Sequence, residues 1–279
     1  MSMSSRRSVV IAGGSTLAAW GLVFAATSRD DVEYDARKRR LFQALSADQI
    51  EGGLHVLEAI AVKDNRMQLS ITHNARIGIG GNPTLGGFTN LEYYPRGTVL
   101  SGVDPALEDG AAGGIVRAAQ CASAALAVTD AAVKAARLGI DLTAVGGRAE
   151  QLPIATASCD AVVSTLVFCS VQDPAQAMSE VARVLRPGGK WLFMEHVAAP
   201  RDGPLLASQR LLDPLQIAIA SGCHLTRHTE ELILSRTQQQ QQQQQQRAPQ
   251  LFSRVEGLER FTVGSRWPAS TQIMGVAVK

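Results

Sequence analysis

Residues Glu180 to His196 read EVARVLRPGGKWLFMEH, and this stretch decides the fold. Its first part has the apolar spacing of an amphipathic helix, with Arg183 and Arg186 near the end where the helix dipole favours positive charge. The letters RPGG cannot continue a helix and predict a tight turn. Residues 190–194 then form a short apolar run that is typical of a buried strand. The order helix, turn, strand indicates an α/β protein.

The same alternation of helices and strands runs through the rest of the chain. Asp173 is expected to cap a helix, with Pro174 at its first position. The strand-helix order predicts a doubly wound, mostly parallel sheet with right-handed crossovers. We expect strands over residues 54–58, 98–103, 141–145, 159–167, 190–194, 258–263 and 272–278, and helices over 34–49, 115–138, 174–185 and 205–221.

The length of 279 residues suits one α/β domain. A hydrophobic fraction of 46% is enough to form a buried core. A net charge of +2 without a basic stripe argues against an extended nucleic-acid face. The spacing of the four cysteines matches neither a CxxC pair nor a zinc motif, so no metal site and no disulfide framework are predicted. That pattern favours a reducing compartment. The cysteines are Cys121, Cys159, Cys169 and Cys223.

Residues 1–30 form a separate segment with an uncharged, mostly apolar run over 9–27. Its length is near the lower limit for a membrane-spanning helix. A membrane anchor, a cleaved targeting peptide that follows Arg6-Arg7, and a buried extension all fit the sequence. We expect the protein to be intracellular and membrane-associated, with organelle or plastid targeting left open. The basic residues on both flanks leave the orientation undecided.

Polar residues follow several predicted strands. Because ligands of open α/β sheets bind at the carboxyl ends of the strands, these positions are candidate site residues. Asp104 ends a strand and suits hydrogen bonds to both ribose hydroxyls of an adenosine ligand; an Asx turn before Pro105 is the alternative. Thr165 lies near the end of the apolar strand expected over residues 159–167. His196 has the side chain of a general base, or it holds a loop at the strand end.

Several segments together resemble class I S-adenosylmethionine-dependent methyltransferases. Within that class they are similar to the membrane-associated methyltransferase-like group that includes the alkyl thiol methyltransferases. The resemblance covers about residues 34–279 and implies a seven-stranded, Rossmann-like methyltransferase domain. The RPGG and GCHLTR segments are its most specific parts. The matching segments are HVLE (55–58), GVDP (102–105), AEQLP (149–153), STLVFCSV (164–171), EVARVLRPGGKWLFMEHVAAP (180–200), DP (213–214), GCHLTR (222–227) and GVAVK (275–279).

The resemblance assigns cofactor contacts. It implies that Glu58, Asp104 and the glycines Gly78, Gly80 and Gly81 bind S-adenosylmethionine, with Ala149 and Glu150 near the adenine and Thr165 near the methyl group. Residues 59–76 interrupt the family's strand-to-glycine motif and resemble an insertion or a gene-model artefact. Arg148 stands where the family often has an acid.

The implied function is methyl transfer from S-adenosylmethionine to a small, hydrophobic acceptor, with a thiol as the specific expectation. His196 is the candidate catalytic base, and the partners are a small-molecule acceptor and a membrane. The alternative is a catalytically degraded methyltransferase fold that acts as a membrane-associated interaction protein. A nicotinamide-dependent oxidoreductase fits the glycines but lacks a hydride-transfer set. The glutamine run 238–246 is low-complexity sequence and predicts a surface loop.

Overall fold

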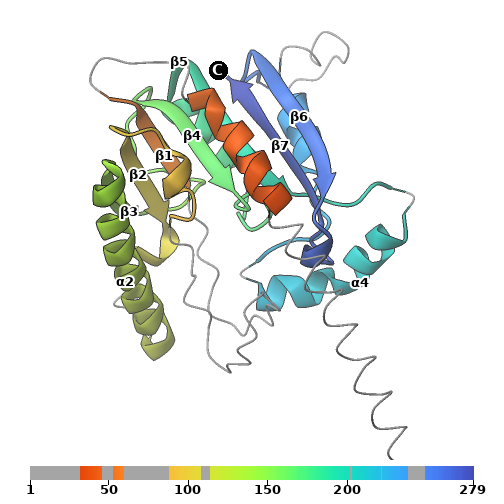
Figure 1. Cartoon of the computed structure of the whole chain (residues 1–279). Coiled ribbons are helices and arrows are strands. Elements are labelled where there is room, and N and C mark those ends of the chain that lie inside the picture. The colour runs from red at the N-terminus through yellow and green to blue at the C-terminus, as the bar shows by residue number, and fades with distance from the viewer. Residues whose placement is uncertain are drawn as a thin grey trace, which may run out of the picture.

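The computed structural model describes residues 32–45, 53–59, 88–107, 114–201, 203–220, 222–237 and 249–279. Its centre is a seven-stranded sheet of order β3-β2-β1-β4-β5-β7-β6 (Figure 1). Five strands are parallel to one another: β1 (His55–Ala59), β2 (Val99–Asp104), β3 (Asp141–Gly146), β4 (Cys159–Thr165) and β5 (Leu185–His196). β7 (Thr271–Val278) runs antiparallel between β5 and β6 (Arg254–Thr262). The predicted doubly wound, mostly parallel fold is confirmed.

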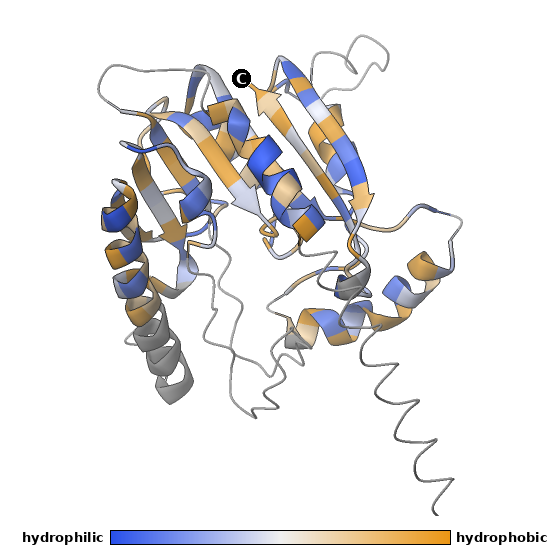
Figure 2. Cartoon of the chain, in the orientation of Figure 1, coloured by the Kyte–Doolittle hydropathy of each residue, from blue (hydrophilic) through white to orange (hydrophobic). Residues whose placement is uncertain are grey.

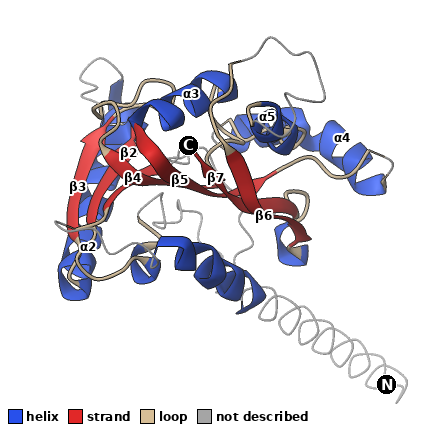
Figure 3. Cartoon of the chain, turned by 90° about the horizontal axis from the view of Figure 1, so that it is seen from above, coloured by secondary structure: helices blue, strands red, loops and turns tan. Residues whose placement is uncertain are grey.

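Helices lie on both faces of the sheet (Figure 3). One face packs against the helix formed by residues 32–45 and against α2 (Gly114–Leu138), through Phe42, Leu45 and Ala135. The other face packs against α3 (Pro174–Val184) and α5 (Thr229–Ser235), around Trp191. α4 (Pro204–Ile219) follows β5, and short 3-10 helices occupy Leu91–Tyr93, Pro105–Leu107 and Gly264–Arg266. The sheet therefore separates two apolar cores, as the orange strand residues in Figure 2 indicate.

The helix, turn and strand predicted from the RPGG stretch are present, but the strand begins earlier than expected. Leu185 already pairs with Cys159, and Lys190 pairs with Ala161, so residues 186–189 bulge out opposite Asp160. Gly188 has a φ of +78°, and Arg186 donates to the Asp160 carboxylate at 2.6 Å. At the start of α3, the Asp173 side chain accepts hydrogen bonds from the amides of Ala175 and Gln176, which confirms the predicted cap.

Two strand boundaries and one helix differ clearly from the expectation. β4 ends at Thr165 rather than at Val167, because Leu166 has a φ of +57° that no strand residue adopts. β6 begins at Arg254, four residues early, and a register shift after Glu256 interrupts its pairing with β7. α5 was not expected at all, because its seven residues are too few for a clear helical period.

The apolar run 9–27, the insertion 59–76, the glycines Gly78, Gly80 and Gly81, and the glutamine run 238–246 lie outside the described residues. Within the part of the chain that the structure does describe, no helix combines the length and apolar character needed to cross a membrane.

Candidate functional site

The site is built at one edge of the sheet. Because β1 to β5 are parallel, their carboxyl ends meet there. Glu58 lies near the end of β1, Asp104 ends β2, Thr165 ends β4 and His196 ends β5. The predicted polar residues thus share one edge, although they come from separate parts of the sequence.

A chain of buried hydrogen bonds joins β1 to β4. The Asn90 side-chain amide donates to Glu58 Oε1 at 2.7 Å and to Thr165 Oγ1 at 3.1 Å. Lys38, from the helix that covers this face, donates to Asn90 Oδ1 at 2.7 Å. The structure therefore brings together the predicted Glu58 and Thr165. It adds Asn90 and Lys38, which sequence reasoning missed because they lie far from both residues in the chain.

Burial has the largest effect on the protonation of Glu58 and Lys38. It raises the pKa of Glu58 to about 7, against the opposing effect of the Asn90 hydrogen bond. Burial likewise lowers the pKa of Lys38 to about 8. Glu58 Oε2 and the Tyr94 hydroxyl are both buried without a hydrogen bond of good geometry among the described residues, and the interaction between these two side chains lowers the pKa of Glu58 against the effect of burial. A buried acceptor of this kind is costly unless a ligand or water donates to it.

Asp104 is 6% exposed and occupies the last position of β2. Its backbone carbonyl accepts from the Gly147 amide at 3.3 Å, which ties the end of β2 to the loop after β3. A Cβ on Gly147 would lie 2.6 Å from Pro153 Cδ, so this close approach requires glycine. The location agrees with the expected ribose contact, which stays a prediction.

The loop after β3 carries Ala149 and Glu150, the residues expected near the adenine. Ala149 packs against the core below α3. Glu150 Oε1 accepts from the backbone amides of Gln172 at 2.6 Å and Asp173 at 3.3 Å. Arg148 lies 3.9 Å from Glu150 Oε2. Glu150 therefore ties this loop to the start of α3, and its adenine contact remains a prediction.

Glu195, beside His196 in β5, anchors the turn that follows β4. Its Oε2 accepts from the amides of Val167 at 2.9 Å and Phe168 at 3.0 Å. Burial raises the pKa of this carboxyl to about 8. The sequence did not predict this role, because a single acidic residue beside His196 forms no recognisable motif. The bond fixes the strained turn at Leu166.

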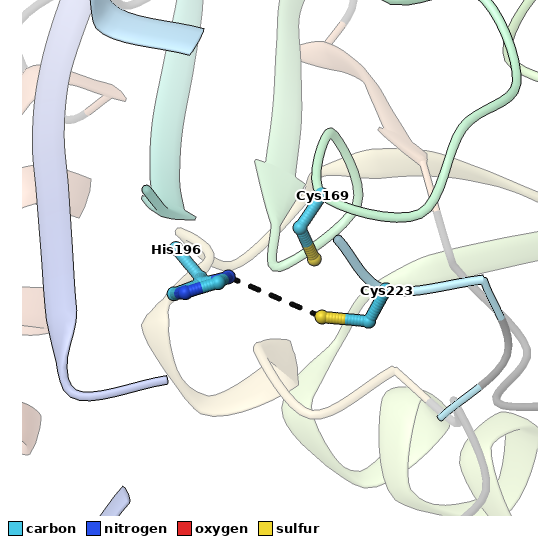
Figure 4. Close-up of side chains that lie close together, drawn as sticks. All are labelled: Cys169, His196 and Cys223. Carbon is cyan, nitrogen blue, oxygen red and sulfur yellow. Dashed lines mark hydrogen bonds between the residues drawn. The ribbon is translucent and has the colours of Figure 1, made fainter. Parts of the chain in front are cut away.

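Beyond that turn, three side chains meet at the ends of β4 and β5. Cys169, His196 and Cys223 come from the loop after β4, the end of β5 and the segment after α4 (Figure 4). His196 Nδ1 lies 4.0 Å from Cys223 Sγ, and the nearest ligand atoms of all three lie within 4.8 Å of one another. His196 is 1% exposed. Its expected role as a base remains a prediction.

Comparison with known proteins agrees with this architecture. Residues 106–193 match the family described as Methyltransferase domain. The chain is 42% identical over 139 residues to Thiol S-methyltransferase TMT1B of Rattus norvegicus, which covers 50% of each protein. It is 47% identical over 76 residues to human Thiol S-methyltransferase TMT1A, or 27% of this chain and 31% of that one. The alignment with the rat protein thus spans about half the length of each chain.

Solved structures show the same fold. A candidate methyltransferase from Bacillus halodurans C-125 superposes with a TM-score of 0.50 at 14% identity, over 86% of this chain and 98% of that chain. At such low identity the likeness concerns the arrangement of the sheet and its helices only.

Proposed function

We propose that this chain, which belongs to the class I S-adenosylmethionine-dependent methyltransferases, transfers a methyl group to a small hydrophobic thiol. One observation carries the proposal. The identity to thiol S-methyltransferases reaches 42% over half the chain, in a protein whose candidate site residues share the carboxyl edge of its parallel strands.

The described residues fit the cofactor. Glu58 Oε2 and the Tyr94 hydroxyl are buried beside the end of β1 without a hydrogen bond of good geometry among the described residues, so a donor on the ligand would complete the bonding of this carboxyl. Asp104, one strand away, supplies a carboxylate for paired hydroxyl donors. When bound, S-adenosylmethionine supplies a methyl group activated by its sulfonium centre.

The protein's part in the reaction is to orient and desolvate the reactants. The Asn90 bridge holds the ends of β1 and β4 at a fixed separation. The Glu195 side chain, through its Oε2, holds the turn after β4 against the end of β5. These contacts fix the strand ends and the turn after β4 at the edge of the sheet where donor and acceptor would meet. A thiol acceptor needs only to lose its proton, which water or a nearby base accepts.

The test is a methyl-transfer assay on the purified full chain with an alkyl thiol and the alcohol of equal length. We expect the methyl thioether to form and the alcohol to remain unmethylated. The comparison controls for hydrophobic binding, because the two acceptors differ only at the reacting atom. Transfer to the alcohol at an equal rate, or no transfer to any thiol by a folded sample, contradicts the proposal.

We also propose that residues 1–30 attach the protein to a membrane. Support comes from the uncharged apolar run 9–27. The full chain should float with liposomes in a density gradient, and a variant without residues 1–30 should stay at the bottom. Equal flotation of both proteins contradicts this attachment.

A further inference from the structure

The cluster of Cys169, His196 and Cys223 is not used by the proposed cofactor site. Each residue is buried, with exposed fractions of 3%, 1% and 9%. Figure 4 shows the two sulfur atoms and the imidazole pointing toward a common centre. Their nearest ligand atoms lie within 4.8 Å of one another. Two thiols and one imidazole are a soft donor set that suits Zn²⁺.

The spacing is close to that of a tetrahedral zinc site. Bond lengths of about 2.3 Å to sulfur and about 2.0 Å to nitrogen place tetrahedral ligands roughly 3.5–3.8 Å apart. Cys223 Sγ and His196 Nδ1 are already 4.0 Å apart. A contraction of about 1 Å at the widest pair completes the geometry, and side-chain rotation can supply it.

A candidate acceptor for the second ring nitrogen of His196 lies on the neighbouring strand β7. A zinc-bound imidazole normally donates its other N–H to an acceptor. His196 Nε2 and Gln272 Oε1 are both buried without partners among the described residues. The two residues pair directly across the antiparallel strands β5 and β7, so their side chains lie on the same face of the sheet. If Nδ1 binds the metal, the proton of the imidazole is on Nε2. This N–H can then donate a hydrogen bond to Gln272 Oε1.

Backbone hydrogen bonds hold the three segments together without a metal. The His224 amide donates to the Cys169 carbonyl at 2.8 Å, which fixes the two cysteine segments side by side. The Ala198 amide donates to the Arg227 carbonyl at 2.8 Å, which joins the histidine segment to them. The Arg227 side chain donates to the Phe168 carbonyl at 2.6 Å. Zn²⁺ with two thiolates is a neutral unit, so this nearby cation adds little repulsion.

We propose that Cys169, His196 and Cys223 bind Zn²⁺ and leave its fourth position open for the acceptor thiol. Three protein ligands with one open position are the pattern of catalytic rather than structural zinc sites. The location supports this assignment, because the cluster follows β4 and β5 at the edge that carries Thr165. The acceptor part of the inference rests on the proposed function; the metal site does not.

The reaction balances without an oxidant. The acceptor thiol releases its proton to solvent and binds as a thiolate, whose lone pair forms the new carbon–sulfur bond to the methyl group. The bond between that methyl and the sulfonium sulfur breaks, and its electron pair neutralises the sulfonium. The thioether product is a weaker ligand than the thiolate and dissociates.

Metal analysis of the full chain tests the site without any activity. Protein stripped with a chelator and refilled should hold one zinc ion, and Cys169→Ser and Cys223→Ser should each lower its affinity at least tenfold. Cys159→Ser is the matched control, because Cys159 is equally buried but begins β4, whereas the cluster follows its other end. The absence of bound zinc in the refilled wild type, or a disulfide between Cys169 and Cys223 by mass spectrometry under non-reducing conditions, overturns the site.

Cobalt substitution tests the open position. A sulfur-to-cobalt absorption band should appear with the metal and strengthen when an alkyl thiol is added. The alcohol of equal length should leave the band unchanged. A bound cobalt ion whose spectrum ignores the thiol overturns the acceptor role. Thiol methylation by a protein that binds no metal would overturn this inference while leaving the proposed function intact.

Gln272 is a positioning residue in this scheme. Gln272→Leu should lower zinc affinity by about 10–100-fold, as expected for a lost partner of a zinc-bound histidine, and Gln272→Glu should restore most of it. Unchanged zinc affinity in Gln272→Leu would show that Gln272 does not support the zinc-bound His196.

Discussion

Burial controls the charge of Glu58 and Lys38, which meet through Asn90 at the end of β1. A carboxyl group that loses its hydration favours the protonated form, and an amine that loses its hydration favours the neutral form. Glu58 therefore titrates near neutral pH. Its protonation state therefore couples the stability of the protein to pH near neutrality.

Glu58 gives a pH prediction. Its pKa is about 7 when folded and about 4.5 when unfolded, so the folded state holds the extra proton between these values. Stability should therefore be highest below pH 4.5, as far as this residue contributes, and fall as pH rises toward 7, by about 3 kcal/mol at most. Glu58→Gln should remove most of this slope in urea unfolding at pH 5 and pH 7.5.

The exposed Glu256, on β6, provides the matched control, since Glu256→Gln makes the same chemical change outside the site. An equal pH slope in wild type and Glu58→Gln contradicts the assignment of the shift to burial of this carboxyl.

Asp104 carries the expected ribose contact. Asp104→Asn keeps the shape of the side chain but removes the charge, so two charge-assisted hydrogen bonds weaken. We expect affinity for S-adenosylhomocysteine to fall by about 10–100-fold, in line with the worth of hydrogen bonds to charged groups. The ligand should raise the melting temperature of wild type clearly and that of Asp104→Asn only at higher concentration. Identical concentration dependence in both proteins rules out the contact.

At the scale of elements, α3 organises the loop that leads into β4. The Arg183 guanidinium donates to the carbonyls of Leu152 and Ile154, and Glu180 accepts from the Leu152 amide. Arg183 also pairs with Glu180 at 2.7 Å, and this interaction lowers the pKa of the Glu180 carboxyl. α3 thereby fixes the loop between β3 and β4, which also carries Ala149 and Glu150.

Arg183→Ala should destabilise the protein by about 1–3 kcal/mol, because it leaves several carbonyls of this loop without their donor. Chemical denaturation measures the loss. The control is Arg210→Ala at an exposed position of α4, which should change stability by less than about 0.5 kcal/mol. An Arg183→Ala variant as stable as wild type means that the loop is held by other contacts.

Most elements follow from sequence, and the exceptions have physical reasons. The core strands were visible as apolar runs because both of their faces are buried. The edge strand β6 alternates partly buried and exposed residues, so the sequence marked only its second half. The Cys169–His196–Cys223 cluster was not visible, because its members lie 27 residues apart in each direction and meet only through the fold. Spacing rules detect metal sites only when the ligands share a local segment.

Some site residues could likewise be predicted from the sequence and others could not. The positions at strand ends were predictable, because parallel strands bring their carboxyl ends to one edge. Their partners were not. Lys38 reaches Asn90 across 52 residues of sequence, and no local pattern encodes that contact.

At the scale of the molecule, the helix of residues 32–45 closes one face of the sheet and also completes the site. Phe42 packs on Tyr93 and Tyr94 with ring centroids 5.3 Å and 5.2 Å apart. Arg37 and Arg40 pair with Glu259 of β6. The helix lies across the middle of the sheet in Figure 1, and its arginine side chains reach the edge strand β6.

Phe42→Ala should cost about 3–5 kcal/mol, the usual penalty for a large core truncation. Since Lys38 sits on the same helix, S-adenosylhomocysteine should protect the variant less against thermal unfolding than it protects wild type. Leu126→Ala is the control, because Leu126 is an exposed hydrophobic residue of α2. If Phe42→Ala loses much stability but the ligand protects it as well as it protects wild type, the helix of residues 32–45 stabilises the fold without contributing to the cofactor site.

The proposed activity depends most on whether this edge of the sheet holds the cofactor, since the sequence predicts that residues 59–76 interrupt the glycine motif. Isothermal titration of the folded full chain with S-adenosylhomocysteine measures this directly. We predict saturable binding of one molecule per chain, which Asp104→Asn weakens. Absence of binding by a cooperatively folded sample, with binding gained when residues 59–76 are deleted, would contradict the account and favour the degraded, non-enzymatic alternative.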